Sequence, residues 1–242
     1  MLIDDLKKEN CRVDLESSDY YREIQRERKI WMDEVERVTH EDSTPMTQAR
    51  LIGVLNENTP DDVVIVTAAG SLPGHLLRLW KTKDPTRKGY HAEYGYSTMG
   101  YEIPGAIGVK LADPKREVIA MVGDATFLMA PQAIVTAVQE RIPVTVVVVD
   151  NHGPQVIRNL QKVCGFVEFG NEFKYRSGDV LEGDYLGIDY VRIAEGMGAA
   201  GIRADTPEEF ADALKRAREI RDRPTVIHAM VEPGRKLLPG YD

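Results

Sequence analysis

Cysteine is scarce in this chain, with two residues, Cys11 and Cys164, among 242. Two cysteines cannot build a disulfide framework or a cysteine-rich zinc site, and we expect a reducing, cytoplasmic setting. Long apolar runs are also missing from the sequence, since no stretch approaches the roughly 20 residues that a membrane-spanning helix needs. The charged start of the chain does not resemble a signal peptide. The sequence therefore indicates neither a disulfide-stapled miniprotein nor a membrane protein.

Basic residues are outnumbered, with 31 Lys and Arg against 39 Asp and Glu and a net charge of −8. This balance argues against nonspecific nucleic-acid binding, which relies on a cationic surface. It does not exclude an anionic small molecule, because a metal ion or backbone amides can hold such a ligand locally. The hydrophobic content of 43% is sufficient for a substantial core in one large domain or two small ones.

Residues 1–43 differ in composition from the rest of the chain. They are dense in charge of both signs and contain neither Gly nor Pro. Ser18 or Asp19 could cap a helix here, because apolar residues follow at near-helical spacing: Tyr20, Ile24, Trp31, Val35 and Val38. This segment either packs on its own domain or serves as a docking arm for another chain. We predict a charged helical arm over 1–43 and a single folded domain over 44–242.

From residue 44 onward, strand and helix patterns alternate. The predicted strands are apolar throughout, which is typical of a parallel sheet covered on both faces; they are 63–67, 117–122, 144–149 and 225–231. Predicted helices are 44–55, 101–111, 131–140, 188–197 and 207–221. The fold class is therefore α/β, a doubly wound and mainly parallel sheet with helices on both faces. A Gly-rich, aperiodic stretch over 162–185 predicts a long loop over a site.

Small and polar residues follow three of these strands, at the edge where ligands bind in open parallel sheets. Asp124 and Asn151 each lie just past a strand end, and one helix joins the two strands, so that a right-handed crossover can make them neighbours. A carboxylate, an amide oxygen and a loop carbonyl form a set of hard oxygen ligands that suits Mg²⁺. Gly123 and the amides of Ala125 and Thr126 could hold a phosphate.

The simpler interpretation of each residue remains open. Taken alone, Asp124 is better explained as a helix cap and Asn151 as a turn residue. Taken together, at corresponding strand ends with Gly nearby, they favour a ligand site.

At this point the chain resembles the thiamine-diphosphate-dependent enzymes. Residues 123–126, followed by a helix, a strand and Asp150-Asn151, are similar to the metal-binding motif of that family. Residues 97–108 are similar to the run that precedes this motif. Within the family, the stretches 68–74, 91–97, 99–103 and 150–153 are closest to trihydroxycyclohexanedione hydrolases. The resemblance covers roughly residues 31–233.

This resemblance implies a thiamine-diphosphate-binding fold and a reaction that cleaves or forms a C–C bond next to a carbonyl. Hydrolytic opening of a cyclic 1,2-dione is the favoured reaction. The alternatives are an acyloin synthase or 2-oxo-acid decarboxylase subunit, or a catalytically silent regulatory subunit. The substrate is in each active case a small carbonyl compound.

The resemblance also implies roles for individual residues. It makes Asp124, Asn151 and the Gly153 carbonyl the Mg²⁺ ligands. It assigns contacts with thiamine diphosphate to seven further residues: Gly70, Ser71, Ser97, Met99, Gly123, Ala125 and Thr126. In the family pattern the Ser97 carbonyl faces the aminopyrimidine ring, and Met99 supports the bent form of the cofactor.

Two positions depart from the family pattern. Ala125 stands where the family usually has Gly, and its methyl group could crowd the diphosphate or demand a different backbone angle. Pro154-Gln155 replaces small and aromatic residues near the expected substrate side. The second departure therefore bears on the identity of the substrate more than on cofactor binding.

Members of this family bind the cofactor between two domains, and only the diphosphate-side domain is recognised here. We therefore expect a split enzyme, in which a separately encoded subunit supplies the pyrimidine-side domain and the activating glutamate. A heterotetramer with two copies of each subunit is the simplest assembly.

Four side chains near the recognised stretches remain as candidates for proton transfer to the substrate: His75, His91, Glu93 and His152. Of these, His91, His152 and Glu93 are our catalytic candidates, although each histidine is as readily explained by a structural role. Tyr94 and Tyr96 are equally consistent with packing and with ligand contact. His40 and His228 have no motif context, and no function is expected of them.

Overall fold

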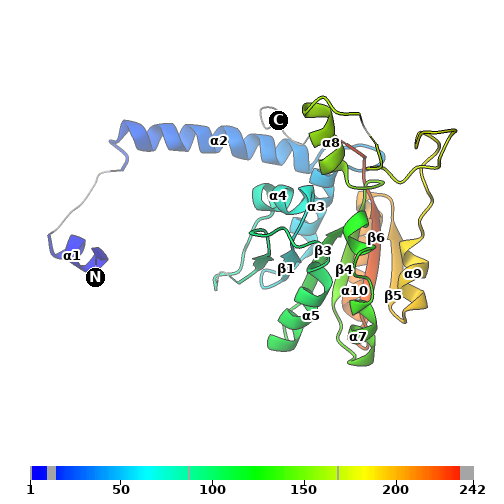
Figure 1. Cartoon of the computed structure of the whole chain (residues 1–242). Coiled ribbons are helices and arrows are strands. Elements are labelled where there is room, and N and C mark those ends of the chain that lie inside the picture. The colour runs from blue at the N-terminus through cyan, green and yellow to red at the C-terminus, as the bar shows by residue number, and fades with distance from the viewer. Residues whose placement is uncertain (1, 10–14, 87, 168, 235–242) are drawn as a thin grey trace. The chain divides into compact units, whose positions relative to one another are not determined.

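The computed structural model describes residues 2–9, 15–86, 88–167 and 169–234. The chain divides into two compact units, Met1–Val38 and Thr39–Asp242. The first unit contains α1 (Leu2–Lys8) and nearly all of α2 (Asp19–Thr39), a long and highly charged helix (Figure 1). Ser18 caps α2, since its Oγ accepts a hydrogen bond from the Tyr21 N–H at 3.4 Å.

The second unit is built on a six-stranded, fully parallel sheet. Its strands are β1 (Val64–Thr67), β2 (Tyr90–Ala92), β3 (Val118–Gly123), β4 (Thr145–Asp150), β5 (Ala200–Ala204) and β6 (Thr225–Met230). They lie in the order β2-β1-β3-β4-β6-β5 across the sheet. The α/β fold class and the four predicted strands are confirmed, whereas the sequence pattern predicts neither β2 nor β5. Both are edge strands, short and without a continuous apolar run.

Helices cover both faces of this sheet (Figure 1). One face packs in a single apolar cluster with α5 (Glu102–Ala112), α7 (Ala133–Gln139) and α9 (Tyr190–Gly196). The other is covered by α3 (Gln48–Asn58), α4 (Ser71–Leu79) and α10 (Pro207–Glu219). Two further helices, α6 (Asp124–Phe127) and α8 (Gln155–Val163), follow the ends of β3 and β4. Among the described residues, no helix is long and apolar enough to cross a membrane.

The sheet places the candidate site at its carboxyl edge. All six residues of β4 are buried, because its Val side chains are covered from both faces. β1, β3 and β4 are parallel neighbours, so the segments that follow them start along one edge of the sheet. The three stretches that the sequence singles out are thereby brought side by side.

Candidate cofactor site

A cavity of about 460 Å³ lies at this edge of the sheet. Its walls come from the segments that follow β1, β2, β3 and β4 and from the starts of α3 and α8. All ten residues assigned to cofactor or metal by resemblance line it: Gly70, Ser71, Ser97, Met99, Gly123, Asp124, Ala125, Thr126, Asn151 and Gly153. The structure therefore brings these residues together, while the role of each one stays a prediction.

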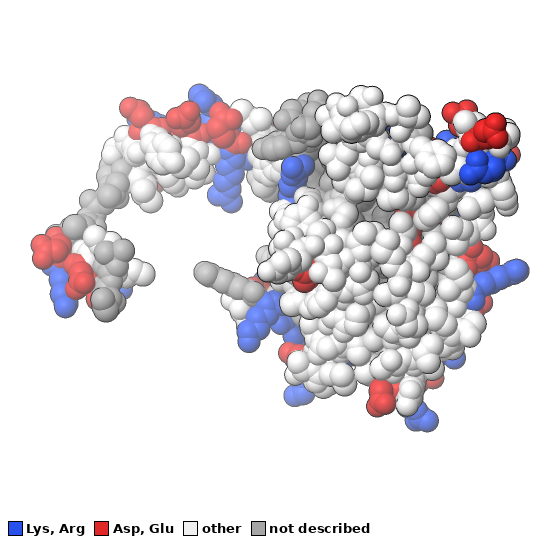
Figure 2. All heavy atoms as spheres, viewed as in Figure 1, with Lys and Arg blue, Asp and Glu red and all other residues white. Residues whose placement is uncertain are grey.

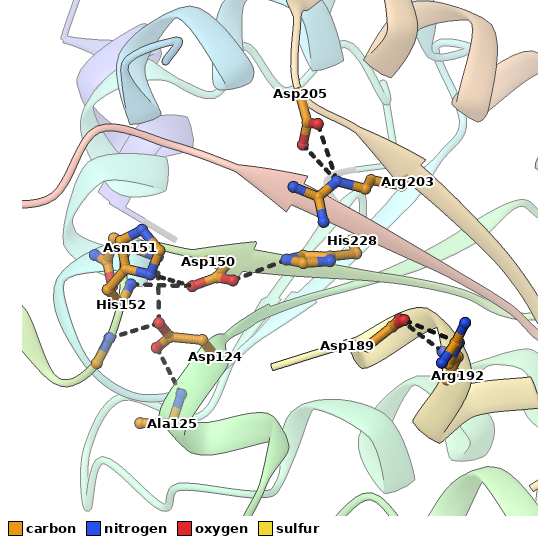
Figure 3. Close-up of polar contacts among 11 residues, drawn as sticks. Asp124, Ala125, Asp150, Asn151, His152, Asp189, Arg192, Arg203, Asp205 and His228 are labelled. Atoms are coloured by element: carbon orange, nitrogen blue, oxygen red, sulfur yellow. Dashed lines mark hydrogen bonds and ion pairs between the residues drawn. The ribbon is translucent and has the colours of Figure 1, made fainter. Parts of the chain in front are cut away.

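Asp124 is the centre of the polar contacts in this cavity (Figure 3). Its Oδ2 accepts hydrogen bonds from the Gly153 N–H at 2.6 Å and from the Asn151 N–H at 3.2 Å. Its Oδ1 accepts one from the Ala125 N–H at 2.6 Å. The expected proximity of Asp124 and Asn151 is thus observed, and it is the backbone of the loop after β4 that closes onto the carboxylate.

The electrostatics of the neighbouring carboxylates Asp124 and Asp150 favour a bound cation. Burial, and next the nearby negative charge of Asp150, raise the pKa of Asp124 to about 7. Burial alone would also raise the pKa of Asp150, but hydrogen bonds from His228 and from the His152 N–H hold it below its usual range. Two buried carboxylates side by side are stabilised by a divalent ion between or beside them.

The donor set fits Mg²⁺ rather than a softer metal. Asp124 offers a carboxylate that is only 2% exposed, Asn151 an amide oxygen and Gly153 a carbonyl oxygen. The described part of the chain holds no group of three or more His, Cys, Asp or Glu side chains suited to a metal. A hard cation that shares its shell with phosphate and water needs no such group.

Another part of the cavity lining, at the start of α4, suits an anion. Gly70 is the N-cap of α4, has φ of +90°, and has open space where a side chain would be. Gly70 has no side chain to cap α4, so within the described part of the chain the first N–H groups of this nine-residue helix are available to a ligand. Ala125 lies within α6, where the backbone is helical, so its methyl group demands no unusual backbone angle.

Two glutamates shape the wall that carries Ser97 and Met99. Glu93 accepts hydrogen bonds from the Thr98 N–H at 2.8 Å and the Tyr96 N–H at 3.2 Å. Glu102, which is buried, accepts them from the Gly100 N–H at 3.0 Å and the Ala69 N–H at 3.3 Å. Ser97 adopts φ of +52°, a strained angle for a residue other than Gly. Both carboxylates therefore hold backbone in place, and Glu102 is a residue that sequence reasoning missed.

The catalytic candidates lie beside the cavity and outside its lining. His91 Nε2 is 2.6 Å from the Tyr101 hydroxyl. His152 stacks on Tyr185, with ring centroids 4.1 Å apart and planes 12° from parallel. His75 has a buried Nδ1 without a hydrogen-bond partner among the described residues. A catalytic role for His91, His152 and Glu93 stays a prediction.

The long loop expected over 162–185 agrees with the structure, because the described residues between α8, which ends at Val163, and α9, which begins at Tyr190, form no helix or strand. Helix α8 extends to Val163, and an irregular segment follows it. This segment contacts the loop after β4, since the Phe173 N–H donates to the His152 carbonyl at 2.9 Å and Tyr185 stacks on the His152 ring. Gln155, at the departure from the family pattern, donates from Nε2 to the Asn151 carbonyl at 3.0 Å.

Sequence reasoning also missed Gln48 and His228. Gln48 lines the cavity from the first turn of α3, after the N-cap Thr47. His228 Nε2 lies 2.8 Å from Asp150 Oδ2 (Figure 3). Neither residue belongs to a recognisable motif, so only the folded arrangement identifies them.

A parallel α/β sheet with a metal-compatible carboxylate and an uncapped helix at one edge defines a cofactor-binding domain of the doubly wound class. Residues 68–229 match the family model described as thiamine pyrophosphate enzyme, C-terminal TPP binding domain. The chain therefore belongs to the thiamine pyrophosphate enzymes and corresponds to their C-terminal cofactor-binding domain.

Similar curated proteins carry the name 3D-(3,5/4)-trihydroxycyclohexane-1,2-dione hydrolase. That of Geobacillus thermodenitrificans is 48% identical over 171 residues, covering 70% of this chain and 26% of the relative. That of Bacillus subtilis is 42% identical over 200 residues, covering 83% and 30%. That of Clostridium perfringens is 37% identical over 250 residues, covering 93% and 38%. The chain thus spans well under half the length of these relatives.

Among solved structures, the chain is similar to the thiamine diphosphate-dependent 4-hydroxybenzoylformate decarboxylase of Rhodococcus jostii RHA1. The TM-score is 0.67 at 26% identity, over 80% of this chain and 34% of that one. The doubly wound fold is therefore shared with a thiamine-diphosphate enzyme whose name gives a different reaction from that of the curated relatives.

Proposed function

We propose that this chain supplies the diphosphate- and Mg²⁺-binding part of an enzyme that cleaves or forms a C–C bond next to a carbonyl. The observation that carries the proposal is the buried Asp124 carboxylate, which is held by the loop after β4 and lines the same cavity as the start of α4. Thiamine diphosphate, when bound, supplies the nucleophile and the electron sink.

In this proposal each wall of the cavity has one task. Asp124, Asn151 and the Gly153 carbonyl hold Mg²⁺, and the amides at the starts of α4 and α6 hold the diphosphate. The wall with Ser97 and Met99 contacts the aminopyrimidine ring and orients it. The residues of these walls bind and orient the cofactor and exclude water. Proton transfer to the substrate involves other groups.

The favoured reaction is hydrolytic opening of a cyclic 1,2-dione, because the similar curated proteins named above are hydrolases of that kind at 37–48% identity. A 2-oxo-acid decarboxylase or acyloin synthase is the second candidate, supported by the structural similarity to a decarboxylase. Turnover of a cyclic 1,2-dione, compared with release of CO₂ from 2-oxo acids by the same assembled enzyme, separates the two.

We further propose that the pyrimidine-side half of the site, with its activating glutamate, comes from another subunit. In the described part of the chain, none of the residues that line the cavity is a glutamate. Large apolar side chains lie exposed on and near its lining: Tyr94, Tyr96, Met99, Met129, Ile157 and Leu160. The surface over α8 is mostly uncharged on the face shown in Figure 2. A second domain packed there would bury this surface, most simply in a heterotetramer.

Calorimetric titration tests the cofactor proposal. Thiamine diphosphate is titrated with Mg²⁺ into the wild type, Asp124→Asn and the control Asp222→Asn, which changes an exposed aspartate. We expect Asp124→Asn to weaken binding by about 100-fold or more, because it removes the charged metal ligand, and the control to bind as the wild type. Equal binding by all three would contradict the proposal.

The subunit proposal has a separate test. The chain alone, with thiamine diphosphate and Mg²⁺, should show no turnover, and adding a polypeptide with a pyrimidine-side domain should restore it. Substantial turnover by the chain alone would overturn the proposal. Cofactor binding without turnover in the assembled complex would instead favour a silent regulatory subunit.

A further inference from the structure

His228 occupies a position in β6 where the sheet is otherwise apolar. It is 1% exposed, and the neighbouring strand residues on its face belong to the apolar cluster shared with α5, α7 and α9, as Val226 and Val148 do. The ring of Tyr190 packs edge-on against its ring, with centroids 4.9 Å apart. An imidazole buried here costs free energy that Val or Ile would not, so a polar contact must offset the cost.

That contact is with Asp150. Nε2 of His228 lies 2.8 Å from Asp150 Oδ2, whereas Nδ1 has no hydrogen-bond partner among the described residues. The polar function of His228 is therefore directed at one carboxylate, which ends the neighbouring strand β4.

Asp150 in turn fixes the loop that carries two of the proposed metal ligands. Its Oδ1 accepts a hydrogen bond from the His152 N–H at 3.0 Å. His152 has φ of +63° and Gly153 has φ of +126°. The left-handed angle at His152 is unfavourable for a residue with a side chain, and local hydrogen bonds must hold it.

We propose that His228 is a positioning residue that acts through Asp150. It holds the Asp150 carboxylate in the one orientation that fastens the His152 N–H (Figure 3). The backbone at 151–153 then stays folded onto Asp124, and Asn151 and Gly153 face the cavity. The consequence for Mg²⁺ rests on the proposed function, whereas the consequence for the loop does not.

Three variants of the full chain separate this role from simple core packing. His228→Gln places an amide N–H at about the reach of Nε2 and should retain the bond to Asp150. His228→Asn carries the same amide group on a side chain that is one methylene shorter and does not reach Asp150. Val226→Ala removes buried volume from the same face of the same strand without touching Asp150, and serves as the packing control.

The first readout is amide hydrogen exchange in the unliganded chain, at His152 relative to Ala120 in β3. We expect His228→Asn to speed exchange at His152 by about tenfold relative to Ala120. His228→Gln should stay close to the wild type, and Val226→Ala should leave the ratio unchanged. Equal effects at both amides, or no rescue by Gln over Asn, would overturn the proposal.

The second readout is the Mg²⁺ concentration needed for half-maximal thiamine-diphosphate binding. His228→Asn should raise it by about tenfold, as outer-shell changes at metal sites do, and His228→Gln should not. An unchanged value in His228→Asn would overturn the claim for the metal. A wild type that binds no cofactor, even with the polypeptide that carries the pyrimidine-side domain present, would overturn the proposed function and leave the exchange result intact.

Discussion

Carboxylates around the cavity mainly hold backbone in place. Asp124 accepts three backbone N–H groups, and Glu93 and Glu102 accept two each. Short loops rich in small residues have few side chains to pack, so that such hydrogen bonds decide their shape. At the scale of single residues, the shape of the site thus depends on carboxylate oxygens that accept hydrogen bonds from backbone N–H groups.

Ala125 offers a test at this scale, since its backbone is helical and its methyl group demands no unusual backbone angle. Ala125→Gly should change the affinity for thiamine diphosphate by less than about threefold and lower the free energy of unfolding by about 0.5–1 kcal/mol. Calorimetry and urea denaturation measure the two quantities. Tighter cofactor binding by tenfold or more would show that the methyl group obstructs the diphosphate.

His75 should make the fold sensitive to acid. Burial, and next the charge of Arg78, lower its pKa to about 4. In the unfolded chain the pKa is near 6.5, so on acidification the unfolded state binds a proton that the folded state refuses. The contribution to stability is complete above about pH 6.5 and is lost as the pH falls from there towards 4.

His75→Leu should remove this dependence. Between pH 7.5 and 4.5, the wild type should lose about 1–3 kcal/mol more unfolding free energy than the variant does. Denaturation by urea at both pH values measures the difference, and the values at pH 7.5 serve as the internal reference. Identical losses in the two proteins would contradict the assignment of a buried, neutral imidazole.

At the scale of elements, Glu102 joins two segments that are distant in sequence. It starts α5 and bonds both the segment after β1, at Ala69, and the segment before α5, at Gly100. The segment that leads into α4 and the segment that carries Ser97 and Met99 are thereby linked through one buried side chain.

Removal of this side chain should loosen both segments. Glu102→Ala leaves the buried Ala69 N–H and the partly buried Gly100 N–H without this acceptor and should lower the free energy of unfolding by about 2–4 kcal/mol. Glu102→Gln keeps one acceptor and should cost about half as much. Urea denaturation gives the order, with the exposed Glu219→Gln as control. Stability in Glu102→Ala equal to the wild type would refute the link.

The central strands could be predicted from the sequence because β3 and β4 are continuous apolar runs, and the residues after them are small and polar. The edge strand β2 has only three residues and no buried one, so it gives no such pattern. Helix α4 contains Pro73 and Gly74, which argue against a helix, yet Pro73 lies in the first turn, where no intrahelical bond is lost.

The partner of His228 could not be predicted either, because Asp150 lies 78 residues earlier. Only the adjacency of β4 and β6 in the sheet brings the two together. Long-range contacts of this kind depend on strand order, which local patterns do not specify. The site residues that the sequence identifies lie within family-like motifs. Residues such as Glu102 and His228, which position them, lie outside any recognisable pattern and could not be predicted.

At the scale of the whole molecule, one cavity brings together the residues proposed to hold the diphosphate and the metal, and apolar side chains lie exposed on and near its lining. This arrangement matches the C-terminal domain of a thiamine pyrophosphate enzyme, which the family comparison identifies. The net charge of −8 is compatible with an anionic cofactor, because amides and a cation would hold it instead of a basic surface.

The location of a bound metal tests the central claim most directly. Crystals grown with thiamine diphosphate and Mn²⁺, a stand-in for Mg²⁺ with a strong anomalous signal, show where the ion lies. We predict one peak bonded to the Asp124 carboxylate, the Asn151 side-chain oxygen and the Gly153 carbonyl, with the diphosphate against Gly70 and the start of α4. An ion or diphosphate bound elsewhere, with this edge of the sheet left free, would contradict the account.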